Sequence, residues 1–258
     1  MLHQLRRHPF PVVAQFEHCL VLTYAVDASA LWPMLPPGLV PDTLDDRDET
    51  GFLAIALVQT RCLRPAGFPR AIGRDFFLSG YRIFARFTTP QGRMLRGLRI
   101  LRSDTDRSTM ASAGNLLTHY NYRLAKVNFT ATQRALSVQI ETPNAEADLV
   151  VNARLDDPKP SLPPDTCFGS EKAARRFAGP LPYTFDYEPE THSIVAIRGR
   201  RQNWRPQLVP VEVRRCTFLE QPALTGGHPR LVSAFYVASI DYRWGRGVRY
   251  ALPAEASV

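Results

Sequence analysis

Short segments rich in β-branched and aromatic residues recur along most of this chain, and turn signals separate them at modest spacing. Alternation of apolar and polar side chains over about four to eight residues is typical of a half-buried β-strand. Because turn residues such as Pro90-Gln91-Gly92 join neighbouring segments, successive strands are expected to pair antiparallel. The pattern predicts a mainly β (α+β) fold with few helices. Strands are predicted at residues 12–24, 51–63, 80–88, 94–101, 126–132, 136–141, 148–155, 193–198, 207–219 and 231–244.

Three short helices are predicted between these strands. Asp27 is an acidic N-cap candidate for an apolar turn that Pro36-Pro37-Gly38 must end, because proline cannot continue a helix. Residues 106–118 contain a run of small residues that suits close packing on a sheet, and residues 170–177 follow Ser170 as N-cap.

A proline-rich connector, DDPKPSLPPDTCFG at residues 156–169, separates the two halves of the chain. It can be a linker between two domains or a long surface loop within one fold. Neither half alone offers enough strands to protect its sheet edges, so a single domain over residues 1–258 is the favoured interpretation. The same reasoning about edges makes a homo-oligomer plausible.

The formal net charge of +8 raises the question of an acidic partner. The basic residues are mostly arginines scattered along the chain, with Lys126, Lys159 and Lys172 as the three lysines. The densest cluster lies at Arg198–Arg205, with Trp204 among the cations. An alternative function is therefore a basic interaction module that binds nucleic acid or an acidic protein through this cluster, although the dispersed arginines weaken it.

The expected location is cytoplasmic, with no membrane partner. No apolar run approaches the roughly 20 residues that cross a bilayer, and the first residues lack the apolar stretch of a signal peptide. Four cysteines are scattered without C-x-x-C spacing, and the histidines show no H-x-x-x-H or H-x-H spacing, so neither a disulfide framework nor a metal site is expected. Nucleotide and serine-hydrolase motifs are missing too, so no cofactor is predicted.

Four separated blocks resemble one family, the domain of unknown function 2071, within the acetoacetate decarboxylase-like superfamily. These blocks are VDASALWPMLPPGLVPDT, the strand that contains Arg82, SAGNLLTHYNYRLAKV at residues 112–127, and IDYRW at residues 240–244. The resemblance implies an acetoacetate decarboxylase-like antiparallel β-barrel with a few flanking helices. It also implies an internal pocket for a small molecule, which can be an organic acid or a carbonyl compound.

The resemblance fails at the chemistry of the superfamily's best-known enzyme. Acetoacetate decarboxylase forms a Schiff base on a neutral lysine, and its lysine pair corresponds here to Tyr122 and Arg123. A phenol has no amine, and a guanidinium stays protonated, so neither can form a Schiff base. Lys126 is a candidate for a relocated lysine, but a regular strand sends it away from Arg123. Family members commonly carry Glu and Asn just before the arginine, where this chain has Leu78 and Gly80, so a more apolar pocket is expected.

The candidate ligand-binding residues are Arg82, His119, Tyr122 and Arg123. The family geometry implies that they meet at the barrel mouth, where two arginines and a phenol can hold a carboxylate and His119 can act as a base. The alternative is that both arginines pair with structural acids such as Asp104 or Asp241 and that His119 caps a helix. Whether the protein is an enzyme, and on which molecule, does not follow from the sequence.

Overall fold

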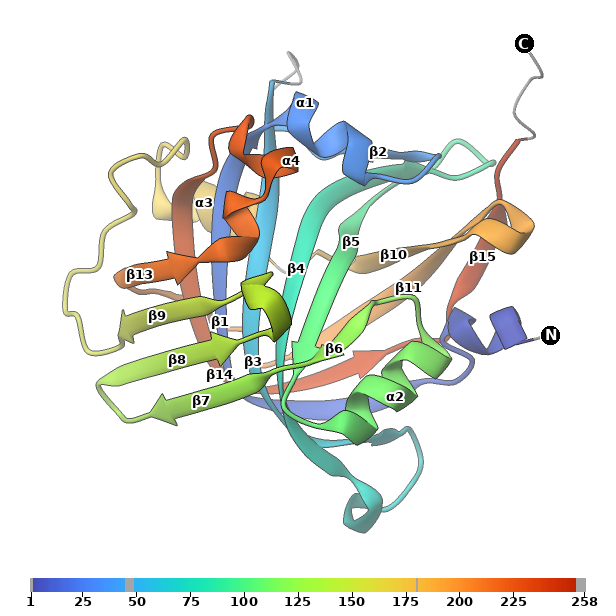
Figure 1. Ribbon diagram of the computed structural model, residues 1–258, viewed down its shortest axis with the longest axis horizontal. Helices are drawn as coiled ribbons and strands as arrows, with labels where there is room; N and C mark the ends of the chain where they lie inside the picture. Colours follow the sequence, from blue (N-terminus) through green and yellow to red (C-terminus); the bar gives the residue numbers. More distant parts are fainter. Residues whose placement is uncertain (1, 45–48, 180, 254–258) are drawn as a thin grey trace.

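The fold is mainly β, as predicted, in the computed structural model, which describes residues 2–44, 49–179 and 181–253 (Figure 1). Eleven strands join one sheet and four form a second. The larger sheet contains β1 (Val12–Asp27), β2 (Leu39–Pro41), β3 (Thr50–Pro65), β4 (Arg74–Thr88), β5 (Met94–Thr105), β6 (Tyr122–Leu124), β10 (Tyr183–Glu188), β11 (Ser193–Gln202), β12 (Gln207–Leu208), β14 (Arg230–Trp244) and β15 (Val248–Ala251). The smaller contains β7 (Lys126–Ala131), β8 (Ala135–Glu141), β9 (Leu149–Arg154) and β13 (Val211–Cys216).

Seven strands of the larger sheet close into a ring. The pairing runs β14–β1–β3–β4–β5–β10–β11 and returns to β14, because Gly199–Gln202 of β11 pair with Asp241–Trp244. Each pair in the ring is antiparallel except β5 with β10, which are parallel. The ring is therefore the expected barrel with one parallel contact, which arises because the chain passes through the smaller sheet between these two strands. Both halves of the chain contribute strands to it, while the single-domain interpretation stays a prediction.

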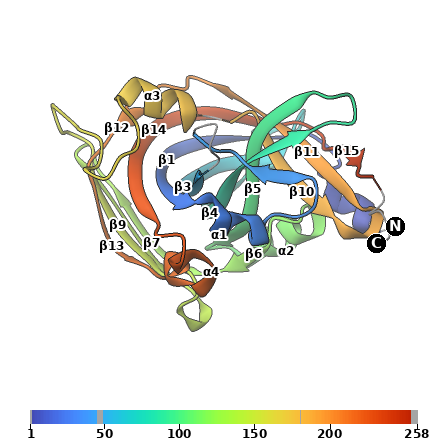
Figure 2. The same cartoon turned by 90° about the horizontal axis from the view of Figure 1, so that it is seen from above.

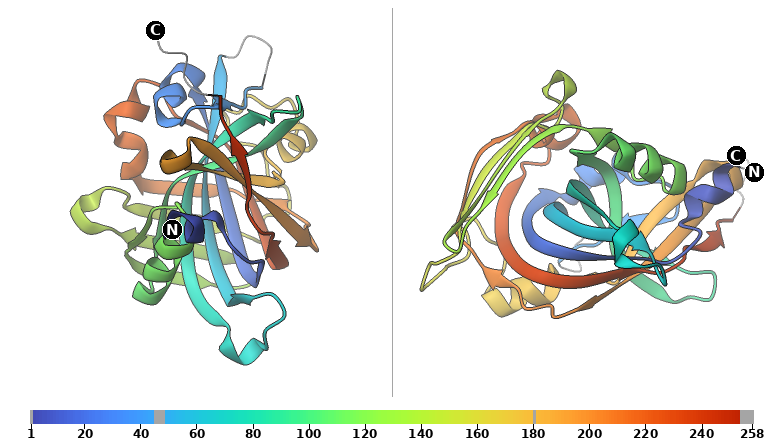
Figure 3. Two further views of the ribbon diagram at one scale, coloured as in Figure 1. Left: turned by 90° about the vertical axis from the view of Figure 1, so that its right-hand side faces the viewer. Right: turned by 90° about the horizontal axis from the view of Figure 1, so that it is seen from below.

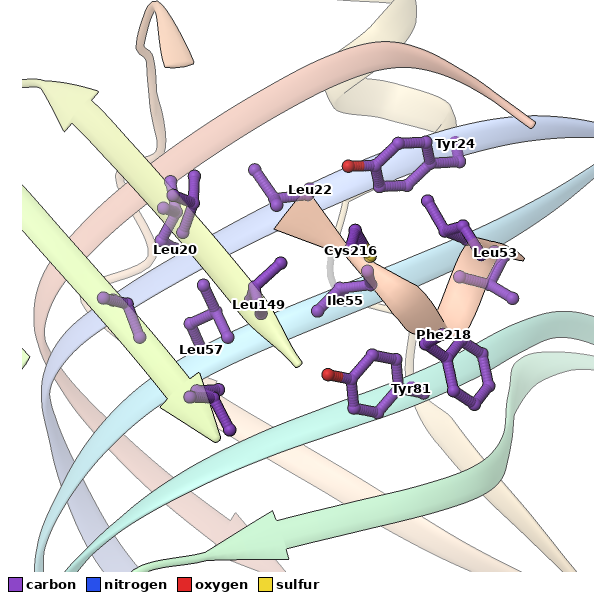
Figure 4. Packing of buried hydrophobic residues seen from close by; sticks show 14 of the residues in the cluster. Leu20, Leu22, Tyr24, Leu53, Ile55, Leu57, Tyr81, Leu149, Cys216 and Phe218 are labelled. Carbon is purple, nitrogen blue, oxygen red and sulfur yellow. The ribbon is translucent and has the colours of Figure 1, made fainter. Parts of the chain in front are cut away.

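The smaller sheet lies against one side of the ring, across β14, β1, β3 and β4 (Figures 2 and 3). Alternate side chains of the ring strands point into this interface, including Leu22 of β1, Ile55 of β3 and Tyr81 of β4. They meet Leu149 of β9 and Phe218, which follows β13 (Figure 4). The residues in between point into the ring, so both faces are buried in the middle of these strands, and Phe52–Val58 of β3 contains no charged residue.

A bulge in β1 determines which residues point into the ring. The pairing of β1 with β3 shifts register between Phe16 and His18. Before the shift, Phe16 faces the interior; after it, Cys19 does, while Leu20 faces the smaller sheet. Because one inserted residue reverses the alternation of side chains, a simple period of two cannot describe the whole strand.

The three predicted helices are confirmed with shorter bounds: α1 (Ala28–Leu31), α2 (Ser108–Leu117) and α3 (Glu171–Phe177). A fourth, α4 (Pro222–Thr225), was not predicted. Ser170 caps α3 as expected, since its Oγ accepts a hydrogen bond from Ala173 N at 3.1 Å. Asp27 occupies the N-cap position of α1 but makes no capping hydrogen bond. Within the described ranges, no helix combines the length and the apolar character needed to span a membrane.

Two differences from the predicted strands have physical reasons. Strand β10 was missed because its buried run is interrupted by charged Asp186 and Glu188, which have cationic partners in Arg99 and Arg7. The single strand predicted at residues 207–219 is two, β12 and β13, in different sheets. Pro210 lies between them and cannot donate to a strand ladder.

Replacement of Ile55 by Ala tests the interface between the ring and the smaller sheet. Ile55 is fully buried there, so Ile55→Ala should lower the free energy of unfolding by about 2–5 kcal/mol, measured by urea denaturation. Leu116→Ala is the control, because its side chain is 51% exposed on α2 and its loss should cost under about 0.5 kcal/mol. Equal effects of the two variants would contradict this assignment of the core.

Candidate functional site

A cavity of about 210 Å³ occupies the interior of the ring. Its wall is mostly apolar, and Ala54 and Ala56 of β3 contribute only methyl groups where larger side chains would fill the space. Helix α2 lines one side through Met110, Gly114 and Leu117. Among the described residues, the lining contains three arginines, which are Arg82, Arg175 and Arg201, and it contains no aspartate or glutamate.

Arg82 reaches the cavity from the middle of β4. Phe76, Leu78, Arg82 and Phe84 alternate along the strand, and all four line the cavity. Gly80 lies beneath the arginine: a Cβ at that position would stand 2.8 Å from Arg82 Nε and 2.9 Å from one terminal nitrogen. The guanidinium therefore folds back along the strand over a glycine. Leu78 and Gly80 make this wall apolar, as the sequence suggested.

Arg82 has no ion pair and no hydrogen bond with any residue that the structure describes, and its Nε is buried without a partner. The side chain is half-buried and faces the cavity, and burial lowers the pKa of its guanidinium. Other arginines of the ring are compensated: Arg99 lies 2.6 Å from Asp186, and Arg102 lies 2.8 Å from Asp104. Arg82 is thus a half-buried cation without an anion, and removing an unpaired charge from water is costly.

A second cation stands close to the first. Arg201 of β11 donates hydrogen bonds to Leu181 O at 3.0 Å and to Tyr242 Oη at 3.1 Å. Its guanidinium also lies over the rings of Trp204 and Tyr242, at 5.5 and 4.9 Å from their centroids. The positive charge of Arg201 contributes to lowering the pKa of Arg82, after the larger effect of burial.

Tyr122 of β6 completes this side of the cavity. Burial raises the pKa of its phenol to about 12, although Arg82 opposes the shift, so the group stays protonated and can donate a hydrogen bond near neutral pH. Helix α2 packs against the aromatic ring of Tyr122, because a Cβ at Gly114 would stand 2.3 Å from a carbon of that ring. Thr60 Oγ1 and Trp204 Nε1 are among the buried polar atoms of the cavity lining that have no hydrogen-bond partner in the described residues.

Besides tyrosines and arginines, the described cavity lining contains two titratable groups that were not among the predicted site residues. His8 is buried at the cavity wall, and burial lowers the pKa of its imidazole, partly offset by nearby backbone carbonyls. Cys19 lies near both Arg82 and Arg201; burial raises the pKa of its thiol to about 11 while the two arginines oppose the shift. Neither stands in a motif, and Cys19 reaches the interior only because of the bulge in β1.

The structure brings together two of the four predicted site residues. Arg82 and Tyr122 line the cavity, and their role in binding stays a prediction. Arg123 is not in the cavity lining and pairs instead with Glu146. Adjacent residues of a strand point to opposite faces, so Tyr122 and Arg123 could not both enter one pocket. His119 is also outside the lining; its backbone N–H donates to Asp186 Oδ2 at 2.8 Å.

The Arg198–Arg205 cluster is divided between the cavity and the surface. Arg201 and Trp204 line the cavity, whereas Arg198, Arg200 and Arg205 are exposed. Nothing in this arrangement supports the alternative of a nucleic-acid-binding module. Sequence reasoning treated the cluster as a possible interaction surface and so missed Arg201 as a pocket residue; it is the pairing of β11 with β14 that turns Arg201 inward.

None of the three lysines lines the cavity. Lys126 of β7 has a side chain that is 88% exposed and lies 3.8 Å from Glu141, and Lys159 and Lys172 are exposed as well. The candidate for a relocated Schiff-base lysine is therefore on the outer surface of the smaller sheet. Within residues 2–44, 49–179 and 181–253, no three His, Cys, Asp or Glu side chains are grouped to hold a metal ion.

Comparison with known proteins identifies one family and one fold. The model of a family described as an uncharacterized conserved protein, the domain of unknown function 2071, matches residues 13–239. No curated protein sequence matches the chain.

Solved structures resemble the chain over nearly its whole length. An acetoacetate decarboxylase from Legionella pneumophila has a TM-score of 0.64 at 12% identity, covering 94% of this chain and 88% of that one. An acetoacetate decarboxylase-like enzyme from Sphingomonas wittichii RW1 has 0.60 at 13%, covering 95% and 94%. The enduracididine biosynthesis enzyme MppR, complexed with pyruvate, has 0.59 at 13%, covering 93% and 90%. At such identities the likeness shows the fold alone.

Gly114→Ala tests the support of Tyr122 by α2. Intrinsic helix propensity favours alanine by about 1 kcal/mol, but the new Cβ would meet the Tyr122 ring, so a net loss of about 1–2 kcal/mol in the free energy of unfolding is expected. Gly169→Ala is the matched control, since its Cβ would enter open space. A Gly114→Ala protein that is more stable than the wild type would show that the aromatic ring of Tyr122 moves freely.

The raised pKa of Cys19 predicts slow, strongly pH-dependent alkylation. With a pKa of about 11, roughly one thiol in a thousand is ionised at pH 8, and this fraction rises about tenfold per pH unit up to pH 10. Iodoacetamide labelling, read by peptide mass spectrometry, should follow that slope at Cys19. Half-buried Cys62 serves as the internal reference. Labelling of Cys19 as fast as Cys62 at pH 8 would contradict the description of its surroundings.

Proposed function

The chain belongs to the family of domain of unknown function 2071, and we propose that it binds a small organic acid in the cavity inside its ring of strands. One observation carries the proposal: Arg82 is half-buried at the cavity wall, with its Nε fully enclosed and no acidic partner in the described part of the chain. An ionised guanidinium without a counter-charge is costly in a protein interior. A carboxylate brought by the ligand removes this cost.

The groups beside Arg82 suit a carboxylate. Guanidinium and carboxylate form charge-assisted hydrogen bonds, frequently in a bidentate geometry. Arg201 adds a second positive charge, and Tyr122 stays protonated and can donate a third hydrogen bond. Because no acidic side chain of the described ranges lines the cavity, those residues do not compete with the ligand for these donors.

The structural neighbours include an acetoacetate decarboxylase and MppR complexed with pyruvate, and both acetoacetate and pyruvate are small organic acids. A Schiff base is not part of the proposal, because the lysines lie outside the cavity. If the protein turns its ligand over, His8 and Cys19 are the titratable groups of the cavity besides its tyrosines and arginines.

A cytoplasmic location fits this proposal. The four cysteines, Cys19, Cys62, Cys167 and Cys216, are free thiols, and free thiols are typical of reducing compartments. A homo-oligomer formed through sheet edges also stays a prediction.

Arg82→Met tests the proposed function by two opposite effects. Loss of the uncompensated charge should raise the free energy of unfolding of the ligand-free protein by about 1 kcal/mol or more, and should abolish stabilisation by organic acids. We expect the wild type to be stabilised in thermal-shift assays by at least one of propionate, pyruvate and benzoate, and not by the corresponding amides.

Arg99→Met is the matched control. It leaves Asp186 buried without its cation, so it should lower the free energy of unfolding by about 3 kcal/mol and leave the discrimination between acids and amides unchanged. A wild type that responds equally to acids and amides, or an Arg82→Met variant destabilised like Arg99→Met, would overturn the proposed function.

A further inference from the structure

The cavity surface next to the two arginines is built from aromatic rings. Phe16 and Tyr242 stack with their ring centroids 4.8 Å apart, and Tyr242 and Trp244 lie 4.2 Å apart. All three line the cavity, as does Trp204, whose ring lies beside Arg201. These rings come from β1, the end of β14 and the segment after β11, which the closing of the ring brings together.

We propose that the ligand is an aromatic carboxylic acid. Its carboxylate lies between Arg82 and Arg201, and its ring lies against Phe16, Tyr242 and Trp244. The inference rests on the proposed function and narrows it from organic acids in general to those with a flat apolar body.

The position of the carboxylate follows from the two cations. Arg201 is held from one side by Leu181 O and Tyr242 Oη, which fixes its guanidinium near Arg82. Two like charges close together in a dry site oppose each other. An anion between them turns this repulsion into two attractions, whereas an anion on Arg82 alone would leave Arg201 without a counter-charge.

The position of the ring follows from the shape and chemistry of the wall. An engineered apolar cavity of about 150 Å³ is large enough to bind benzene, so a cavity of about 210 Å³ accommodates a benzene ring with a carboxylate attached. Aromatic pairs gain about 0.5–1.5 kcal/mol beyond the burial of their area. A short aliphatic acid would satisfy the arginines but leave Phe16 and Trp244 in contact with water, so it should bind more weakly.

Isothermal titration calorimetry with four simple compounds tests the inference. Benzoate provides charge and ring, propionate charge alone, benzamide ring alone, and cyclohexanecarboxylate a non-aromatic ring of similar size. We expect the wild-type Kd for benzoate to be at least tenfold lower than for propionate or benzamide, and about threefold or more lower than for cyclohexanecarboxylate. Quenching of the fluorescence of Trp204 and Trp244 by benzoate, in a Trp32→Phe background, locates the binding, because the exposed Trp32 is outside the cavity lining.

Phe16→Leu keeps an apolar side chain at the wall but removes one ring. It should weaken benzoate at least fivefold and change propionate less than twofold. Phe168→Leu is the matched control, because Phe168 is a buried phenylalanine outside the cavity lining, and it should leave both affinities unchanged. If Phe16→Leu fails to fold, the comparison of benzoate with cyclohexanecarboxylate in the wild type still decides the role of the ring.

The two proposals fail in different ways. If propionate or cyclohexanecarboxylate binds as tightly as benzoate while acids still bind better than benzamide, the aromatic inference is overturned and the proposed function stands. If benzoate and benzamide bind equally, or neither binds, and Arg82→Met changes nothing, both are overturned.

Discussion

The pairing of β11 with β14 is the contact on which the rest of the structure depends. It joins the last strand of the ring to the first, so that every strand between them acquires an inside and an outside. Strands with two buried faces need apolar side chains at successive positions, and β3 shows this along Phe52–Val58. Inside the ring, the small Ala54 and Ala56 leave a cavity; outside, the larger Leu53, Ile55 and Leu57 fill the space against the smaller sheet.

Buried acids in the fold are paired with arginines, whereas Arg82 of the candidate site has no acidic partner among the described residues. Asp186, Asp104 and Glu188 are almost completely buried, and each has an arginine within 2.8 Å. Arg99 and Asp186 join β5 to β10, Arg7 ties the first residues to β10, and Arg102 and Asp104 are both on β5, so the protein compensates these charges internally. Arg82 departs from that pattern in a cavity whose lining contains no acid. A residue that lowers the stability of the ligand-free protein, and whose unfavourable effect a bound ligand removes, is typical of a binding site.

The family resemblance predicted the fold correctly, while the details of the site needed the structure. It implied a ring of strands with few helices and an internal pocket, and it identified the arginine at position 82. It also excluded the lysine pair, since Tyr122 and Arg123 occupy those positions. The grouping of Arg123 and His119 with Arg82 followed the family geometry, but alternation along β6 turns Arg123 toward Glu146, and Asp186 holds the backbone of His119.

The sequence by itself determined the local structure of this protein. It indicated most of the strands, the helix that Ser170 caps and the end of the first helix before Pro36-Pro37-Gly38, and it showed no lysine where the superfamily's enzyme needs one. These depend on residues within a few positions of one another. Only the tertiary structure decided which faces of the strands meet. Arg201, Trp204 and Tyr242 come to Arg82 through strand pairing, and Cys19 through a bulge that reverses the alternation of β1. The sequence specifies which side chains are charged, but whether a charged side chain has a partner depends on which strands pair next to it.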